Sequence, residues 1–275
     1  MHCSFSFEKG TGKKQELIIR DMPVFLLKII AAVTMLIDHV GYGFFPEEVI
    51  FRSIGRVAFP LYAFLLAEGY YHIKDDPEKE KRHFRRIVLL TVVSEVIYDL
   101  FMTGKVWDPQ SQSVMPTLLL GMMGLMVAKR YEKKPVIVYG FSILTMGVAH
   151  FLHPNYGLMG VLMIYFFYWY TSSFRKTPFL QKYIILLGFS AVWVLGFNWF
   201  RFGFPDADTL VKKSLDAWQW MAPFPVIDIL IASYKGENGY KNRVLNTLYA
   251  WFYPAHLLVL AILELCMGIV HFKWF

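Results

Sequence analysis

The sequence predicts an all-α protein, a polytopic transmembrane helix bundle with about nine spans and a cytoplasmic N-terminus. First, 56% of the 275 residues are hydrophobic and only 18% are charged, whereas a soluble domain carries about a quarter charged residues. Second, apolar runs recur along the chain with brief connections between them. Third, positive charge gathers in alternate connections, as it does on the cytoplasmic side of membrane proteins.

The apolar runs define the expected spans, because a helix needs about 20 apolar residues to cross a bilayer. Asp38 and His39 interrupt the first run, which favours a retained helix over a cleaved signal peptide. No repeat or long linker divides the chain. We therefore expect residues 1–23 to form a cytoplasmic tail and residues 24–275 a single membrane domain. Its spans are predicted near residues 24–44, 53–73, 85–103, 114–129, 135–151, 157–172, 182–200, 216–233 and 246–270.

Charge sets the orientation of these spans. The net charge is +7, and most of the 28 lysines and arginines fall on the side that holds the N-terminus. The basic segment EKEKRHFRR, residues 78–86, is interpreted as an anchor to anionic lipid headgroups rather than as a nucleic-acid site. The two cysteines, Cys3 and Cys266, are too differently placed to predict a disulfide, and no metal-binding spacing is present.

Ionisable side chains at matched depths are the main clue to function. At 1.5 Å per helical residue, Asp38 and His39 of the first predicted span lie roughly 8 Å below the outer surface of the membrane. Charges at such depths are costly, so they usually face a partner or a cavity. The outer half of the bundle is predicted to hold Asp38, His39, Arg52, Arg56, Glu95 and Asp99.

A second group is expected towards the cytoplasm, with Lys28, Glu68 and Asp228 at similar depths and His256 near the middle of the last span. Ion pairs such as Asp38–Arg56 and Lys28–Glu68 could serve only to lock helices together, and the sequence leaves this structural reading open. His39 is different, because an ion pair does not require an imidazole. Beside Asp38 and two arginines, it is a candidate general base.

Several motifs resemble those of one known family. The first two spans contain LKIIAAVTMLIDHVGYGFF and FRSIGRVAFPLYAFLLAEGYYH. Two later stretches are HPNYGLMGVLMI, residues 153–164, and YKGENGYKNRVLNTLYAWFYPAHLL, residues 234–258. The chain resembles the TraX family of bacterial membrane proteins from about residue 25 onward. A departure from that pattern is SVMPT, residues 113–117, where a more polar opening with an asparagine is expected.

The resemblance implies a multi-pass acyltransferase in the bacterial cytoplasmic membrane, related to sugar O-acetylases and to the heparan N-acetyltransferase. The founding member is associated with acetylating the N-terminus of conjugative pilin. Cytoplasmic acetyl-CoA would be the donor, with no metal, and a peptide or glycan would be the acceptor. His39, Asp38 and Arg56 are the candidate catalytic residues. The residues expected to bind the cofactor are Lys28, Arg52, Glu68 and His256.

Two rival classes use the same residues. A transporter or channel would employ the buried charges as a path for an ion or a solute. A membrane assembly factor without enzymatic activity would need them only for folding. Consumption of acetyl-CoA by the purified protein distinguishes both from an acyltransferase.

Overall fold

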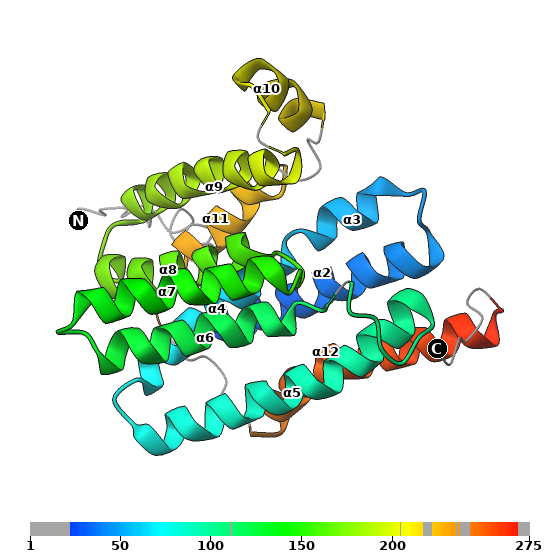
Figure 1. The fold of residues 1–275 in the computed structure, drawn as a ribbon, viewed down its shortest axis with the longest axis horizontal. Helices are drawn as coiled ribbons and strands as arrows, with labels where there is room; N and C mark the ends of the chain where they lie inside the picture. Colours follow the sequence, from blue (N-terminus) through cyan, green and yellow to red (C-terminus); the bar gives the residue numbers. More distant parts are fainter. Residues whose placement is uncertain are drawn as a thin grey trace, which may run out of the picture.

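The structure is a computed structural model that describes residues 23–110, 112–203, 205–216, 222–234, 236 and 243–268 (Figure 1). Within these ranges the regular elements are all helices, as the sequence predicts. The tail of residues 1–22 and residues 269–275 lie outside the described part. The helices are α2 (Val24–Phe44), α3 (Val49–Gly55), α4 (Ala58–Ile73), α5 (Pro77–Thr103), α6 (Met115–Arg130), α7 (Pro135–Phe151), α8 (Gly157–Phe174), α9 (Phe179–Arg201), α10 (Ala207–Asp216), α11 (Phe224–Ala232) and α12 (Arg243–Cys266).

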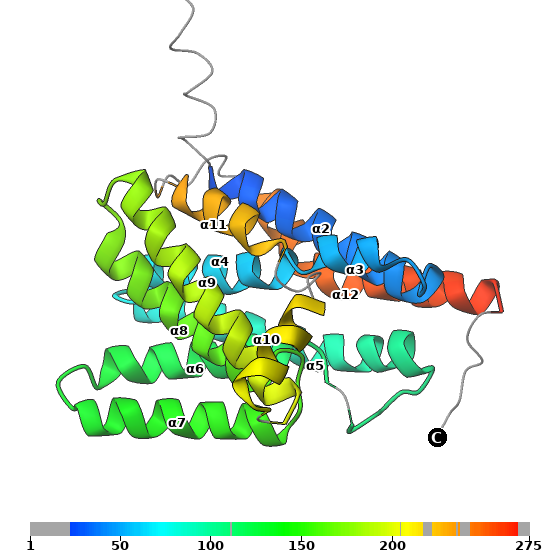
Figure 2. The same cartoon turned by 90° about the horizontal axis from the view of Figure 1, so that it is seen from above.

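Helices from both ends of the described chain pack against each other. The first helix, α2, packs against α3, α4 and α12, and α12 also lies along α5. On the other side, α4 packs against α8, while α6, α7 and α8 contact one another and α9 packs against α11 (Figures 1 and 2). The junction of α2, α4, α5 and α12 therefore joins segments far apart in the sequence.

The outer surface of the bundle is strongly apolar. Val136 on α7 is 83% exposed, and Val192 on α9 is 70% exposed. Exposed apolar side chains of this size on separate helices indicate a surface that faces lipid rather than water. The protein is accordingly a helical membrane protein.

The number of spans is less simple than the sequence indicates. Among the described residues, four helical segments are long and apolar enough to cross a bilayer: Val24–Phe44, Val49–Ile73, Phe179–Trp199 and Val244–Cys266. The predicted span at 216–233 contains only the nine residues of α11 in its described part, about 14 Å of helix, which is shorter than a bilayer core. Helix α10 was not anticipated. The count of nine spans stays a prediction.

The start of α5 extends the bundle on the basic side. Asp76 caps this helix by accepting a hydrogen bond from the Lys79 backbone N–H, and Pro77 occupies its first turn. The Lys79 side chain, whose Nζ lies 2.8 Å from Asp76 Oδ2, and the Lys79 backbone N–H hold the pKa of Asp76 below its usual value. The helix consequently begins eight residues before the predicted span at 85–103, and its polar first turns carry His83 to the edge of the bundle.

Candidate functional site

A small cavity of about 90 Å³ lies at the centre of the predicted outer cluster. It is bounded by α2, by the break between α3 and α4, by α5 and α12, and by the loops before α6 and α8. This cavity, called the outer cavity below, brings together four of the predicted residues. Its polar lining comprises Asp38, His39, Arg52, Arg56, Tyr62, Tyr98, Asn155, Tyr156 and Tyr253.

His39 and His256 form a direct pair across α2 and α12. His39 Nδ1 lies 2.8 Å from His256 Nε2, and the two rings stack with their centroids 5.0 Å apart. Both side chains are buried, at 8% and 7% exposed. The sequence predicts His256 as a cofactor-binding residue, whereas in the structure its ring contacts the candidate base His39.

The hydrogen bonds around the pair determine which nitrogen is basic. His256 Nδ1 lies 2.7 Å from the backbone oxygen of Phe252. A carbonyl oxygen only accepts, so His256 Nδ1 carries the proton and Nε2 of the neutral ring is an acceptor. His39 Nδ1 must then donate to it. The remaining nitrogen of a neutral His39, Nε2, is left with its lone pair available as a base.

Asp38 forms an ion pair with Arg52, and not with Arg56 as the sequence suggests. Arg52 Nη1 lies 2.8 Å from Asp38 Oδ2, and the other carboxylate oxygen occupies the space that a side chain at Gly55 would take. Arg56 follows directly after α3 and donates from Nη1 to the Tyr156 hydroxyl at 3.3 Å. The two arginines, which share a helical face in sequence, therefore have different partners.

The two acidic residues of α5 serve the loop that precedes α6. The Asp99 carboxylate accepts the backbone N–H of Asp108 at 2.9 Å, and Glu95 accepts both the backbone N–H and the hydroxyl of Ser113. These contacts fix the opening of α6, where the sequence departs from the TraX pattern. Glu95 and Asp99 thus hold the edge of the site, while His256 contacts His39.

The loop between α7 and α8 supplies residues that the sequence analysis did not single out. Tyr156 has a left-handed backbone, with φ +66°, and its ring stacks on Phe59 with centroids 3.9 Å apart. The neighbouring Asn155 donates from Nδ2 to the Tyr98 hydroxyl at 2.9 Å. The signal was present in HPNYG, a polar run next to a glycine between two apolar spans. An asparagine does line the cavity, but it comes from this loop instead of residues 113–117.

A larger cavity of about 450 Å³, called the inner cavity, opens towards the basic side of the bundle. Lys28 lines it and donates to Asn246 Oδ1 at 2.9 Å. Glu68 also lines it, but its carboxylate has other partners, so the predicted Lys28–Glu68 pair is wrong. The apolar part of its wall includes Leu65, Leu66, Ile73, Ile87, Leu90, Met115 and Leu118.

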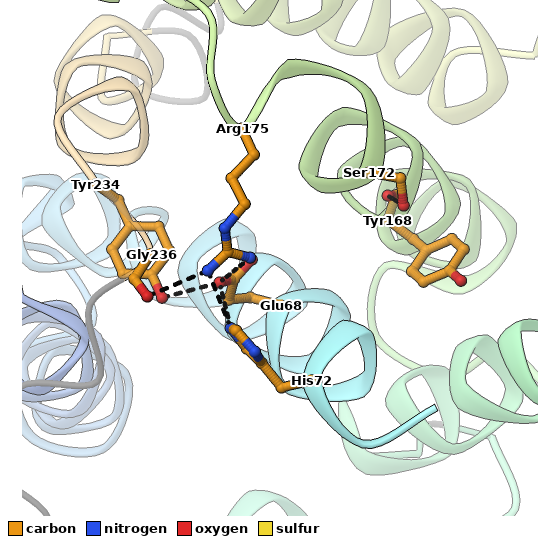
Figure 3. A network of polar contacts seen from close by, with 7 residues as sticks. All are labelled: Glu68, His72, Tyr168, Ser172, Arg175, Tyr234 and Gly236. Carbon is orange, nitrogen blue, oxygen red and sulfur yellow. Dashed lines mark hydrogen bonds and ion pairs between the residues drawn. The ribbon is translucent and has the colours of Figure 1, made fainter. Parts of the chain in front are cut away.

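Glu68 is the centre of a polar network at one end of this cavity (Figure 3). The side chain is 3% exposed, and its Oε1 lies 3.2 Å from Arg175 Nη1, 3.0 Å from His72 Nε2 and 2.9 Å from the Tyr234 hydroxyl. Arg175 also donates to the backbone oxygen of Gly236 at 3.1 Å. The network ties α4 to the α8–α9 connection and to the segment after α11.

Positive charge in the inner cavity comes from Lys28 and Arg86. His83, in the polar first turns of α5, accepts a 2.7 Å hydrogen bond from Arg86. Burial, together with the nearby charges of Arg86 and Lys28, lowers the pKa of His83 to about 4. His83 is therefore neutral at physiological pH. The two cationic side chains and the apolar wall make this cavity suitable for an amphipathic anion.

Comparison with known proteins places the chain in a family. The family model for TraX protein matches residues 24–264, nearly the whole described bundle. The chain belongs to the TraX family. Both histidines of the pair and both cavities lie inside the matched range.

Two curated relatives share shorter stretches. An uncharacterized protein of Rickettsia prowazekii (strain Madrid E) is 33% identical over 81 residues, which cover 30% of this chain and 31% of the relative. The "Probable fimbrial assembly protein FimC, serogroup H1" of Dichelobacter nodosus is 26% identical over 118 residues, 39% of this chain and 47% of the relative. The matches thus span less than half of either relative. No solved structure matches this TraX-family chain.

Proposed function

We propose that this TraX-family protein transfers an acetyl group from acetyl-CoA, bound in the inner cavity, to an amine or hydroxyl that enters the outer cavity. The observation that carries the proposal is the His39–His256 pair, which leaves His39 Nε2 as a base inside a cavity that also holds Arg56. A packing histidine would not need a second imidazole to fix its tautomer.

The proposed chemistry is a direct acyl transfer. His39 Nε2 takes the proton of the acceptor as the acceptor nitrogen or oxygen bonds to the acyl carbon. The carbon–sulfur bond then breaks, and the coenzyme A thiolate leaves with the proton that His39 has held. His256 stabilises the positive imidazolium by accepting from His39 Nδ1 throughout. Atoms and charge balance without a metal or an external reductant.

Arg56 is proposed to stabilise the oxyanion that develops on the acyl carbonyl. A preorganised positive group in a site shielded from water is an effective way to lower such a barrier. Arg52 is a weaker candidate for this role, because its charge is already balanced by the Asp38 carboxylate at 2.8 Å. Arg52, predicted to bind cofactor, is instead proposed to position Asp38 at the outer cavity.

Donor binding is assigned to Lys28 and Arg86. Coenzyme A carries several phosphate charges and a long arm, which suits a cavity with two cations at one end and aliphatic side chains along its wall. Glu68 would repel phosphate, so we assign it to holding Arg175 in place rather than to binding the donor. His256 leaves the cofactor-binding set as well, because it contacts His39.

The acceptor is proposed to be the amino terminus of a surface-fibre subunit. Support comes from the relative whose name describes fimbrial assembly. The matched stretch covers 47% of that relative.

The test is acetyl-CoA consumption by the purified protein in lipid nanodiscs, followed as release of free thiol. We expect thiol release by the wild type and none by His39→Asn, whose amide nitrogen can still donate to His256. Mass spectrometry of an added peptide amine would show a gain of one acetyl group. Uptake of acetyl-CoA into proteoliposomes without thiol release would support the transporter class and overturn the proposal.

A further inference from the structure

The two cavities meet at a shared wall of tyrosine side chains. Tyr62 on α4 and Tyr253 on α12 line both the outer cavity and the inner cavity. Tyr249, one turn before Tyr253, lines the inner cavity and stacks on Tyr62 with centroids 5.7 Å apart and planes 14° apart. These three residues are called the tyrosine wall below.

The tyrosine wall adjoins the histidine pair. The Tyr253 ring meets His39 edge-on at 6.1 Å between centroids and His256 at 5.8 Å. Its side chain is only 7% exposed, so it is packed in place by the pair. Tyr62 is less buried and faces both cavities, with one neighbouring ring in Tyr249. Of the two tyrosines that line both cavities, Tyr62 is therefore the one to change, because Tyr253 contacts the histidine pair.

The sizes of the two cavities limit what can cross this wall. The inner cavity, at about 450 Å³, accommodates the bulky part of a donor, whereas the outer cavity measures about 90 Å³. For the reaction, the carbonyl carbon of the donor thioester must reach an acceptor beside His39. The rest of the acyl chain, the alkyl tail bonded to this carbon, then lies in or next to the outer cavity. There the tail competes for space with the acceptor and with the packed rings of Tyr62 and Phe59.

We infer that Tyr62 sets the length of the acyl chain that the protein transfers, restricting it to two or three carbons. The inference rests on the proposed function, because it concerns the donor of that reaction. A closely packed protein interior has no spare volume, so accommodating an added methylene costs free energy. An added methylene that a pocket cannot place typically changes discrimination by about 10- to 200-fold.

The test compares acetyl-CoA, butyryl-CoA and hexanoyl-CoA as donors, with thiol release in nanodiscs as the readout and kcat/KM as the quantity. The wild type should favour acetyl-CoA over butyryl-CoA by about tenfold or more. Tyr62→Ala should lower that ratio by about tenfold, since removing the ring makes room for a longer acyl chain beside His39, and Tyr62→Leu should lower it less. Tyr62→Phe keeps the ring and should keep the ratio.

Tyr139→Ala is the matched control, because Tyr139 is 69% exposed on α7 and lines neither cavity. It should leave the donor ratio at the wild-type value. If the wild type uses acetyl-CoA and butyryl-CoA equally, or if both Tyr62→Ala and Tyr62→Leu fold and leave the ratio unchanged, the inference is overturned while the proposed function stands. Absence of thiol release from every donor by the wild type would instead overturn the proposed function, and the inference with it.

Discussion

The Nδ1 atom of His39 lies 2.8 Å from the Nε2 atom of His256, although 217 residues separate the two along the chain. The contact joins the first described helix to the last. Because His256 also donates to the carbonyl oxygen of Phe252, the chain of hydrogen bonds has one direction. It ends at His39 Nε2, where the proposed chemistry takes place.

Replacing the base should remove activity without removing the pair. In His39→Asn, the side-chain amide can donate to His256 Nε2 but cannot take up a proton. We expect thiol release from acetyl-CoA to fall by about 10²- to 10⁴-fold, with a melting temperature close to that of the wild type. His150→Asn, at an exposed position of α7, is the control. Wild-type turnover in His39→Asn would leave His39 as a packing residue.

Removing the orienting histidine should affect turnover more than donor binding. His256→Ala leaves the His39 N–H without its acceptor in a buried position, which costs about 1–3 kcal/mol of stability, and it frees the His39 ring to change tautomer. We expect kcat to fall while KM for acetyl-CoA changes little. His256→Gln offers an amide oxygen in place of Nε2 and should restore part of kcat. If His256 were merely structural, His256→Ala would lower the amount of folded protein but leave kcat per folded molecule at the wild-type value. His256→Gln would then restore melting temperature and total activity together.

Much of this site could be predicted from the sequence because charged residues in apolar helices are conspicuous. Asp38, His39, Arg52 and Arg56 are expected to share the outer half of the bundle, and all four line one cavity. The pairing could not be predicted, because depth along a helix does not fix rotation about its axis. Arg52 and Arg56 lie four residues apart, yet the break after α3 separates their partners.

The fold, like the site, could be predicted only in part from the sequence. Helical content and membrane character follow from composition and from the spacing of apolar runs. The short helix α11 does not, because a nine-residue apolar segment and a longer span can share similar hydropathy. Helix α10 does not either, because its polar sequence has no apolar run to mark it. Tyr156 and Asn155 were missed because loop residues reach a site only through tertiary structure.

The close approach of α2 and α3 depends on Gly55. A Cβ atom at this position would collide with the Asp38 carboxylate, so Gly55→Ala must displace Asp38 and with it the ion pair to Arg52. We expect a loss of about 1–3 kcal/mol in unfolding free energy, together with reduced activity. Gly140→Ala on α7, where nothing lies within 4 Å of the added atom, should instead stabilise by about 0.5–1 kcal/mol. Thermal melts in the same detergent measure both changes.

The predicted orientation can be tested by cysteine labelling from either side of the membrane. In a background with Cys3 and Cys266 replaced by serine, Lys81→Cys and Lys213→Cys place single thiols at exposed positions on α5 and α10. The charge bias predicts that a membrane-impermeant reagent added to intact cells labels position 213 and spares position 81. Labelling of both positions from the same side would contradict the predicted topology.

The charges of the inner cavity should control the affinity for the donor. Lys28→Glu and Arg86→Glu each replace attraction to a phosphate with repulsion, and we expect Kd for acetyl-CoA to rise by about tenfold or more, equivalent to at least about 1.4 kcal/mol. Wild-type affinity should also weaken with added salt, because partly exposed ion pairs are screened. Lys133→Glu is the matched control, since Lys133 is exposed in the α6–α7 connection and does not line the cavity. Affinity is measured by calorimetry in nanodiscs. If Lys28→Glu and Arg86→Glu bind acetyl-CoA at low salt as tightly as the wild type and Lys133→Glu do, the donor site lies elsewhere.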